Sequence, residues 1–226
     1  MSCMIFGTTG LCGKAFLETA EKSSCFSAIT SITRRPINST SQKIKEIVEE
    51  DTDKYVNIIN DEKPSIVFSG LATTRGAAGS AKAFVDIDHG INLKIAQASK
   101  DAGVNTFIIV SSVGASALSP FLYFKTKGRL EDDIIALKFP RTIILRPGPL
   151  IGQREASKGF GNDLSSAVFK HIHGTFLGRN IFYPIKASEV ASAAVSLIQT
   201  PPQESSEPQV MIVGGRELLD VALSQN

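Results

Sequence analysis

The chain has 226 residues, of which 42% are hydrophobic, and its 24 basic and 22 acidic residues leave a formal net charge of +2. This length and apolar content are sufficient for one sizeable core, so a single domain over residues 1–226 is expected. The balanced charge excludes a large field of one sign, and nucleic acid is therefore not expected as a partner. Because no apolar run reaches the roughly 20 residues that cross a bilayer, no transmembrane segment is expected.

The three cysteines, Cys3, Cys12 and Cys25, lie near the start of the chain and show no CxxC spacing. Their odd number and positions predict free thiols in a reducing compartment. The first ten residues pass directly from an apolar run into a glycine turn, which leaves no room for a signal peptide or an Arg-rich presequence. The residues therefore predict a soluble, cytosol-facing protein.

Short runs of β-branched and aromatic residues alternate along the chain with longer segments of helical spacing. Strands are predicted at 3–6, 28–33, 65–69, 106–110, 142–146 and 210–213, with a weaker one at 46–50. Helices are predicted at 11–21, 86–102, 120–137 and 188–199. This alternation indicates a three-layer α/β fold with a central, mostly parallel sheet covered by helices on both faces. Residues 150–190 are expected to form most of a small substrate lobe.

The stretch "GTTGLCG" follows the first predicted strand and opens the first predicted helix. Glycine in this pattern lets the backbone turn tightly and approach a pyrophosphate, while the free N–H groups of the helix start face its negative charge. The spacing GxxGxxG between strand and helix therefore predicts a dinucleotide site. The alternative is a tight turn of small residues and nothing more. The cofactor-binding residues predicted here are Gly7, Thr9, Gly10, Leu11, Cys12 and Gly13.

Two arginines, Arg34 and Arg35, stand at the end of the second predicted strand, where an acidic residue would bind the ribose of NAD. An arginine fork complements a 2′-phosphate in charge and geometry, so NADP(H) is the predicted cofactor. Two solvated arginines on a loop are the alternative. Asp51, after the weak strand, is predicted to meet the adenine edge. Backbone contacts to the cofactor are predicted further on, at Leu71, Ala72 and Thr73.

Ser111 and Ser112 follow the predicted strand 106–110. Ligands of open parallel sheets bind outside the carboxyl ends of the strands, so either hydroxyl could hold a substrate carbonyl. Ser112 is the preferred candidate because the strand is expected to end there. A pair of serines after a strand is more often only a turn.

Tyr123 lies near the start of the next predicted helix, for which Ser119 and Pro120 supply an N-cap and a first-turn proline. Residues four apart on a helix are neighbours, whereas residues two apart point to nearly opposite sides. Lys127 can therefore neighbour Tyr123, and Lys125 cannot. Gly128 costs roughly 1 kcal/mol of helix propensity relative to alanine, which the close approach of a cofactor or of another backbone would explain.

A tyrosine beside a lysine can act as a proton donor in hydride transfer. An ordinary tyrosine, with a pKa near 10, is a poor acid–base group at neutral pH unless its anion is stabilised. One cation about 4 Å away, at an effective dielectric constant near 20, supplies about 4 kcal/mol, and an oxidised nicotinamide adds to it. The pair thus needs no metal. The HxH pair His171 and His173 has no evident third ligand, so no metal site is predicted.

The same motifs in the same order resemble the atypical branch of the short-chain dehydrogenase/reductase superfamily. They are more closely similar to the Tat-interacting oxidoreductase family, of the animal tumour-suppressor type, and to its fungal counterpart of the mitochondrial outer membrane. The stretches that carry the resemblance are "GTTGLCG" (7–13), "RR" (34–35), "LATTRG" (71–76), "VSSVGA" (110–115), "YFKTKGRLE" (123–131) and "LRPGPLIG" (145–152).

The resemblance implies a Rossmann fold, bound NADPH and a catalytic set of Tyr123, Lys127 and Ser112 or Ser111. It also implies that Pro147 and Leu150 line the nicotinamide end, and that Tyr123 and Lys127 contact the cofactor. Peripheral attachment to the cytosolic side of the mitochondrial outer membrane rests on the resemblance alone. An asparagine sometimes joins this catalytic set in the wider superfamily, and Asn92 lies in the preceding predicted helix, but it is not included in the predicted site.

Three functions are compatible with these patterns. The preferred one is an NADPH-dependent reductase of an unidentified small-molecule carbonyl substrate. The second is an NADP(H)-binding regulatory or interaction protein with little turnover, whose partners could be other proteins or a second copy of the chain. The third, a sugar-nucleotide epimerase, is disfavoured because such relatives are usually much longer.

Overall fold

The computed structural model describes residues 1–151, 184–201 and 207–224. Seven strands form one sheet in the order β3-β2-β1-β4-β5-β6-β9, and every neighbouring pair is parallel. The strands are β1 (Ser2–Phe6), β2 (Ala28–Thr33), β3 (Ile44–Val48), β4 (Ile66–Ser69), β5 (Thr106–Val110), β6 (Arg141–Arg146) and β9 (Gln209–Gly214). This order is that of a doubly wound Rossmann fold, which confirms the predicted fold class.

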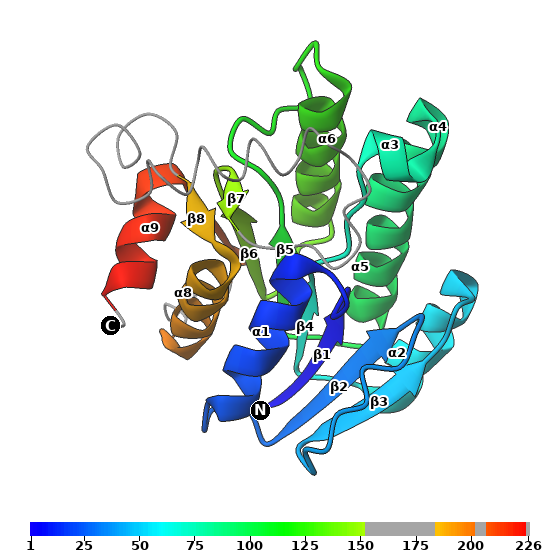
Figure 1. The fold of residues 1–226 in the computed structure, drawn as a ribbon, viewed down its shortest axis with the longest axis vertical. Coiled ribbons are helices and arrows are strands. Elements are labelled where there is room, and N and C mark those ends of the chain that lie inside the picture. The colour runs from blue at the N-terminus through cyan, green and yellow to red at the C-terminus, as the bar shows by residue number, and fades with distance from the viewer. Residues whose placement is uncertain (152–183, 202–206, 225–226) are drawn as a thin grey trace.

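Helices cover both faces of the sheet (Figure 1). One face packs against α1 (Leu11–Lys22), α8 (Ala187–Gln199) and α9 (Gly215–Leu223). The other face packs against α2 (Tyr55–Glu62), α5 (Asn92–Asp101) and α6 (Leu122–Ala136). The remaining described elements are η1 (Thr52–Lys54), α3 (Arg75–Ala78), α4 (Ala81–Val85), η2 (Asp86–Ile91) and the short parallel pair β7 (Leu150–Ile151) and β8 (Ile185–Lys186).

The first strand shows why the sequence forms this sheet. Cys3 and Ile5 belong to the core on the α1 side, whereas Met4 and Phe6 belong to the core on the α5 side. Side chains of a strand alternate between faces, so a strand buried on both faces needs a continuous apolar run. The runs of the central strands therefore lie inside the molecule, whereas the edge strands β3 and β9 are partly exposed.

The strand order reverses between β1 and β4. From β1 the chain adds β2 and β3 in one direction, then crosses back to place β4 on the other side of β1. Ligands of open parallel sheets bind at such a switch point, at the carboxyl ends of the strands. The glycine turn after β1 and the segment 70–74 after β4 both lie at this point of the sheet.

Several predicted boundaries were wrong. The weak strand runs over Ile44–Val48, two residues earlier than predicted, and α2 and α9 were not predicted at all. The helix predicted at 86–102 is the later part of a longer run formed by α4, η2 and α5, in which η2 is a π-helix.

The start of α6 also differs from the prediction. Its N-cap is Phe121, without a side-chain cap, and the first helical residue is Leu122. Ser119 Oγ instead accepts a hydrogen bond from the Phe121 N–H at 3.2 Å. The local turn that this serine stabilises delays the helix by two residues, because Ser side chains compete with helical backbone bonding.

Candidate functional site

The backbone of the glycine turn packs closely against the backbone that follows β4. Gly7 has φ +82°, and a Cβ added to it would lie 2.8 Å from backbone atoms of Gly70 and Leu71. A Cβ on Gly13 would lie 2.1 Å from the Gly7 carbonyl oxygen. Real side chains do not tolerate such distances, so these two positions require glycine. The third glycine, Gly10, donates its N–H to Gly7 O at 2.9 Å and closes the turn.

The start of α1 offers an anion site. Gly10 is the N-cap, and no side chain caps the helix. The first backbone N–H groups of a helix lack intrahelical acceptors, and the helix dipole adds partial positive charge there. Because the turn has no side chains at Gly7, Gly10 and Gly13, a pyrophosphate can approach these groups closely. The residues present thus fit a bound dinucleotide.

The two arginines after β2 are exposed. The Thr33 hydroxyl donates to the Arg35 carbonyl oxygen at 2.7 Å, which fixes the backbone at the end of the strand. Burial raises the pKa of the Tyr55 hydroxyl, and the positive charge of Arg34 opposes that rise. Asp51 accepts the Asp53 N–H at 3.0 Å and caps η1. Its carboxylate therefore has a structural partner at the position predicted to meet the adenine.

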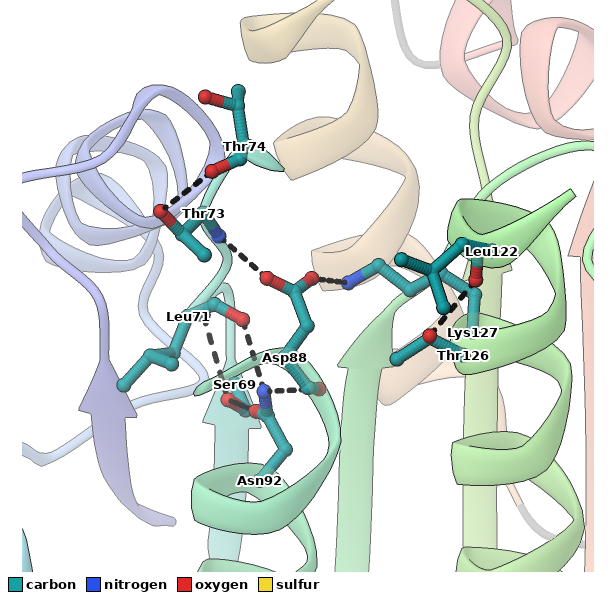
Figure 2. A network of polar contacts seen from close by, with 9 residues as sticks. All are labelled: Ser69, Leu71, Thr73, Thr74, Asp88, Asn92, Leu122, Thr126 and Lys127. Atoms are coloured by element: carbon teal, nitrogen blue, oxygen red, sulfur yellow. Dashed lines mark hydrogen bonds and ion pairs between the residues drawn. The ribbon is translucent and has the colours of Figure 1, made fainter. Parts of the chain in front are cut away.

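Side chains of η2 and α5 form a polar network with the segment after β4 (Figure 2). The Asn92 side chain donates to the Leu71 carbonyl oxygen at 3.0 Å and accepts from the Ser69 hydroxyl at 2.5 Å. The Thr73 N–H donates to Asp88 Oδ2 at 2.7 Å. The Leu71 N–H donates to the Ser69 hydroxyl at 3.5 Å, so both polar backbone groups of Leu71 and the Thr73 N–H are engaged within the protein. Contacts from this segment to a cofactor must use its other atoms.

Lys127 lies in the same network. Its side chain is 2% exposed, and its Nζ lies 2.8 Å from Oδ1 of Asp88, whose side chain is fully buried. The contact is an ion pair, and neither atom has a hydrogen bond of normal geometry within the part of the chain that is described. An ammonium has three donors. Lys127 thus has N–H donors left for other partners, while its ammonium charge is paired with Asp88.

Tyr123 precedes Lys127 by one helical turn on α6 and is 42% exposed. Its ring lies against Phe124 and Phe84, with centroid distances of 5.3 Å and 6.1 Å. Its hydroxyl makes no hydrogen bond with any residue of the described ranges. The tyrosine is therefore held by contacts of its ring with these two phenylalanines.

The two candidate serines differ in environment. β5 ends at Val110, so both serines follow it. Ser111 is buried, and its Oγ has no hydrogen-bond partner among the residues described. Ser112 is half-buried, and its hydroxyl donates to the Val113 carbonyl oxygen at 3.2 Å. Accessibility favours Ser112 for contact with a substrate, whereas Ser111 has the unused hydroxyl.

The loop that carries these serines packs directly on α6 at Gly128. A Cβ on Gly128 would lie 2.2 Å from Ser116 C and 2.3 Å from Ala117 N. The Ser116 N–H also donates to the Phe124 carbonyl oxygen at 3.1 Å. Of the two explanations offered for this helical glycine, the approach of another backbone is the one that the structure supports. This contact fixes the serine loop against the helix that carries Tyr123.

A second ion pair fixes the carboxyl end of β6 to α6. Arg146 Nε donates to both oxygens of the buried Glu131, at 3.0 Å and 3.2 Å, and Arg146 also contacts Glu131 through a terminal nitrogen. Hydrogen bonding to Glu131 raises the pKa of Arg146. Pro147 follows directly, and its carbonyl accepts the Val113 N–H at 3.0 Å. Leu150, the other residue predicted at the nicotinamide end, begins β7.

Four polar residues of the site were not among those predicted: Asp88, Asn92, Glu131 and Arg146. Asp88 and Asn92 lie four residues apart, and Glu131 lies four residues after Lys127. These spacings place polar groups on the inner faces of helices, which is the one sequence signal that could have found them. Their partners are far away in the chain, and a sequence pattern does not supply them.

The predicted histidine pair and most of the predicted substrate lobe, residues 152–183, fall outside the described residues. His89, on η2, pairs with Asp133, with 2.6 Å between Nε2 and Oδ2. Within the described ranges, no group of three His, Cys, Asp or Glu side chains could hold a metal ion.

Several solved structures that contain NAD have the same fold. MoeE5 in complex with UDP-glucose and NAD superposes with a TM-score of 0.70 and 16% identity, covering 100% of this chain and 82% of that chain. A UDP-glucuronic acid 4-epimerase from Bacillus cereus in complex with NAD gives a TM-score of 0.68 and 14% identity, covering 95% and 78%. These similarities establish the class of the fold, which is the Rossmann fold that MoeE5 and this epimerase share.

Sequence comparison establishes the family. The model of the HIM1 family matches residues 24–186, and the chain belongs to this family. The mitochondrial protein FMP52-1 of Scheffersomyces stipitis is 47% identical over 226 residues, covering 98% of each chain. The mitochondrial protein FMP52 of Saccharomyces cerevisiae is 40% identical over 228 residues, covering 99% of this chain and 97% of its own. The predicted similarity to a fungal mitochondrial family is thereby confirmed.

Helices long and apolar enough to cross a membrane are absent from the part of the chain that the structure describes.

The contact at Gly128 leads to a prediction about stability. Gly128→Ala should lower the free energy of unfolding by about 3 kcal/mol, because the new methyl group overlaps with the backbone of Ser116 and Ala117. The measurement is urea unfolding followed by circular dichroism. Gly76→Ala is the matched control, because a Cβ at Gly76 meets nothing within 4 Å. Equal effects of the two substitutions would contradict the prediction.

Proposed function

We propose that the protein is an NADP(H)-dependent oxidoreductase of the carbonyl reductase type. The observation that carries the proposal is the convergence of three groups at the carboxyl end of one parallel sheet. These are a glycine turn that would admit a pyrophosphate, a serine pair after β5, and Tyr123 with Lys127 on the adjoining helix. Each pattern alone is common, but their combination is what hydride transfer to a carbonyl requires.

The cofactor would lie along the switch point of the sheet. In this proposal its pyrophosphate contacts residues 7–13, its 2′-phosphate contacts Arg34 and Arg35, and its adenine lies near Asp51. Residues 71–73 line its middle part, and Pro147 and Leu150 line its nicotinamide end. The residues after β2 support NADP(H) over NAD, because two exposed arginines stand where an acidic ribose ligand would be needed.

The reaction follows from the residues at the nicotinamide end. NADPH, when bound, supplies a hydride. The Ser112 hydroxyl donates to the carbonyl oxygen of the substrate and holds the carbonyl carbon in position. As negative charge develops on that oxygen, the Tyr123 phenol transfers its proton to it, so that hydride and proton together give an alcohol. The Lys127 ammonium stabilises the tyrosinate that remains.

A second function deserves the same tests. The protein could bind NADP(H) mainly as a regulatory or interaction module with little turnover. The observation that favours it is the pairing of the Lys127 ammonium with Asp88, with 2.8 Å between Nζ and Oδ1. Protein partners or a second copy of the chain would be its targets.

Location and substrate lobe complete the proposal. The relatives in Scheffersomyces stipitis and Saccharomyces cerevisiae are named mitochondrial proteins. In agreement with those names, we propose peripheral attachment to the cytosolic side of the mitochondrial outer membrane. Residues 150–190 would form most of the lobe that covers the substrate within a single domain.

Removal of the arginines tests the choice of cofactor. Arg34→Ala and Arg35→Ala should each weaken NADPH binding about 10- to 100-fold, because each removes a charge-assisted contact to the 2′-phosphate. NADH binding should change by less than about threefold, since NADH lacks that phosphate. Both affinities are measured by titration of cofactor fluorescence. Arg216→Ala on α9 is the control, and an equal loss for both cofactors would refute the assignment.

Tyr123→Phe separates the two functions. The variant should bind NADPH as tightly as the unaltered protein, and its kcat on a carbonyl substrate found by screening should fall about 100- to 10,000-fold. Steady-state kinetics and cofactor titration measure the two effects. Full turnover by the variant would end the proposed mechanism. Broad screening that finds no substrate, together with tight NADPH binding, would favour the regulatory module.

The serine pair provides an internal comparison. Ser112→Ala should lower kcat/KM about 10- to 100-fold, because it removes a hydrogen bond to the developing oxyanion. Ser111→Ala, next to it in the chain, should retain kcat/KM within about threefold because Ser111 is buried. The same substrate and the same kinetic assay serve both variants. The reverse result would assign the substrate hydroxyl to Ser111.

A further inference from the structure

Asp88 lies at the centre of the polar network in Figure 2 and contacts two separate parts of the candidate site. Its Oδ1 lies 2.8 Å from Lys127 Nζ on α6. Its Oδ2 accepts the Thr73 N–H at 2.7 Å, in the segment that follows β4. Both oxygens of one fully buried carboxylate are thus engaged with partners 39 and 15 residues away in the chain, which no local spacing would join.

The helical run around Asp88 explains how one side chain reaches both partners. Asp88 belongs to the π-helix η2, which widens the run between α4 and α5. Asn92 begins α5 one turn later, and its side chain donates to the Asp88 and Leu71 carbonyl oxygens, both at 3.0 Å. π-helical turns are rare and frequently occur at functional sites, where they re-aim side chains. Here the widened turn directs Asp88 and Asn92 together at residues 69–73.

A purely structural role does not account for a carboxylate at this position. A buried ion pair is, as a rule, no more stabilising than well-packed apolar residues of the same volume, because both charges lose their hydration. A charged pair does, however, fix how its two side chains are oriented relative to each other. A carboxylate that holds an ammonium through one oxygen and a backbone N–H through the other makes the positions of the two depend on each other.

We propose that Asp88 is a positioning residue that couples the Thr73 segment to Lys127. The segment that would lie along the cofactor and the lysine that would assist Tyr123 are then placed by one carboxylate. A displacement of either one is transmitted to the other. The coupling is inferred from these two contacts alone, whereas its consequence for cofactor binding rests on the proposed function.

The coupling is tested first without any cofactor. Lys127→Met should speed hydrogen exchange of the Thr73 amide at least tenfold, because Asp88, left buried without its counter-charge, takes up a proton and is then a poorer acceptor for that amide. NMR of the ¹⁵N-labelled protein measures the rate. Lys125→Met is the matched control on the same helix and should leave the rate within twofold. Equal rates in the two variants would overturn the proposal.

Asp88→Asn decides the matter should Lys127→Met not fold. The variant keeps an oxygen that can accept the Thr73 N–H but removes the negative charge. We expect it also to speed exchange of the Thr73 amide at least tenfold, and an unchanged rate would overturn the proposal. Lys127→Arg, which keeps the positive charge, should retain most of the protection.

The consequence is tested with NADPH. Asp88→Asn should weaken NADPH binding about tenfold, and the double variant Asp88→Asn/Lys127→Met should bind no more weakly than the weaker single variant, because coupled residues act as a unit. Asp133→Asn, an acidic residue of α6 that pairs with His89, should bind within twofold of the unaltered protein. Additive losses would overturn the coupling. Absence of NADPH binding to the unaltered protein would overturn the proposed function instead, and the exchange rates would still decide on Asp88.

Discussion

The contact on which the rest of this structure depends is the meeting of three glycines between β1, α1 and β4. A Cβ on Gly7 would collide with Gly70, a Cβ on Gly13 would collide with Gly7, and a Cβ on Gly70 would lie 3.1 Å from Gly13 N. Because none of the three has a side chain, the chain turns from strand to helix within a few residues and lies directly against the neighbouring strand. The helix start then faces the switch point of the sheet, where the partial positive charge of the helix dipole favours an anion.

Three consecutive constraints fix α6, the helix that carries the candidate catalytic residues. Lys127 pairs with Asp88, Gly128 admits the backbone of Ser116 and Ala117, and Glu131 pairs with Arg146. These positions lie on one side of the helix, since they are one and four residues apart. Each reaches a different element, namely η2, the loop after β5 and the end of β6. Tyr123 is therefore presented on a helix whose rotation and depth are both determined.

Two ion pairs of the candidate site contain buried charges. Removing one member of a buried ion pair typically costs about 3–5 kcal/mol, because the other charge is left uncompensated. The Lys127–Asp88 pair and the Arg146–Glu131 pair are both largely removed from solvent and both end at the carboxyl edge of the sheet. One pair joins α6 to η2, and the other joins α6 to the end of β6. This restraint suits a site in which a proton donor must meet a substrate in one geometry.

The amino-acid sequence by itself determined the α/β class with its parallel sheet, the glycine turn and the Tyr123 and Lys127 spacing, because all three depend on local periodicity and on the backbone freedom of glycine. It also indicated that Gly128 needs a close neighbour. Only the tertiary structure decided which neighbour that is, and only it brought Asp88 to Lys127 and Glu131 to Arg146. Such pairs join residues from different elements, and their choice depends on how helices rotate against the sheet. The late start of α6 has a different, local cause, because Ser119 stabilises a turn and does not cap the helix. A short sequence pattern contains no information on these long-range contacts, whereas the packed fold has one arrangement that satisfies them.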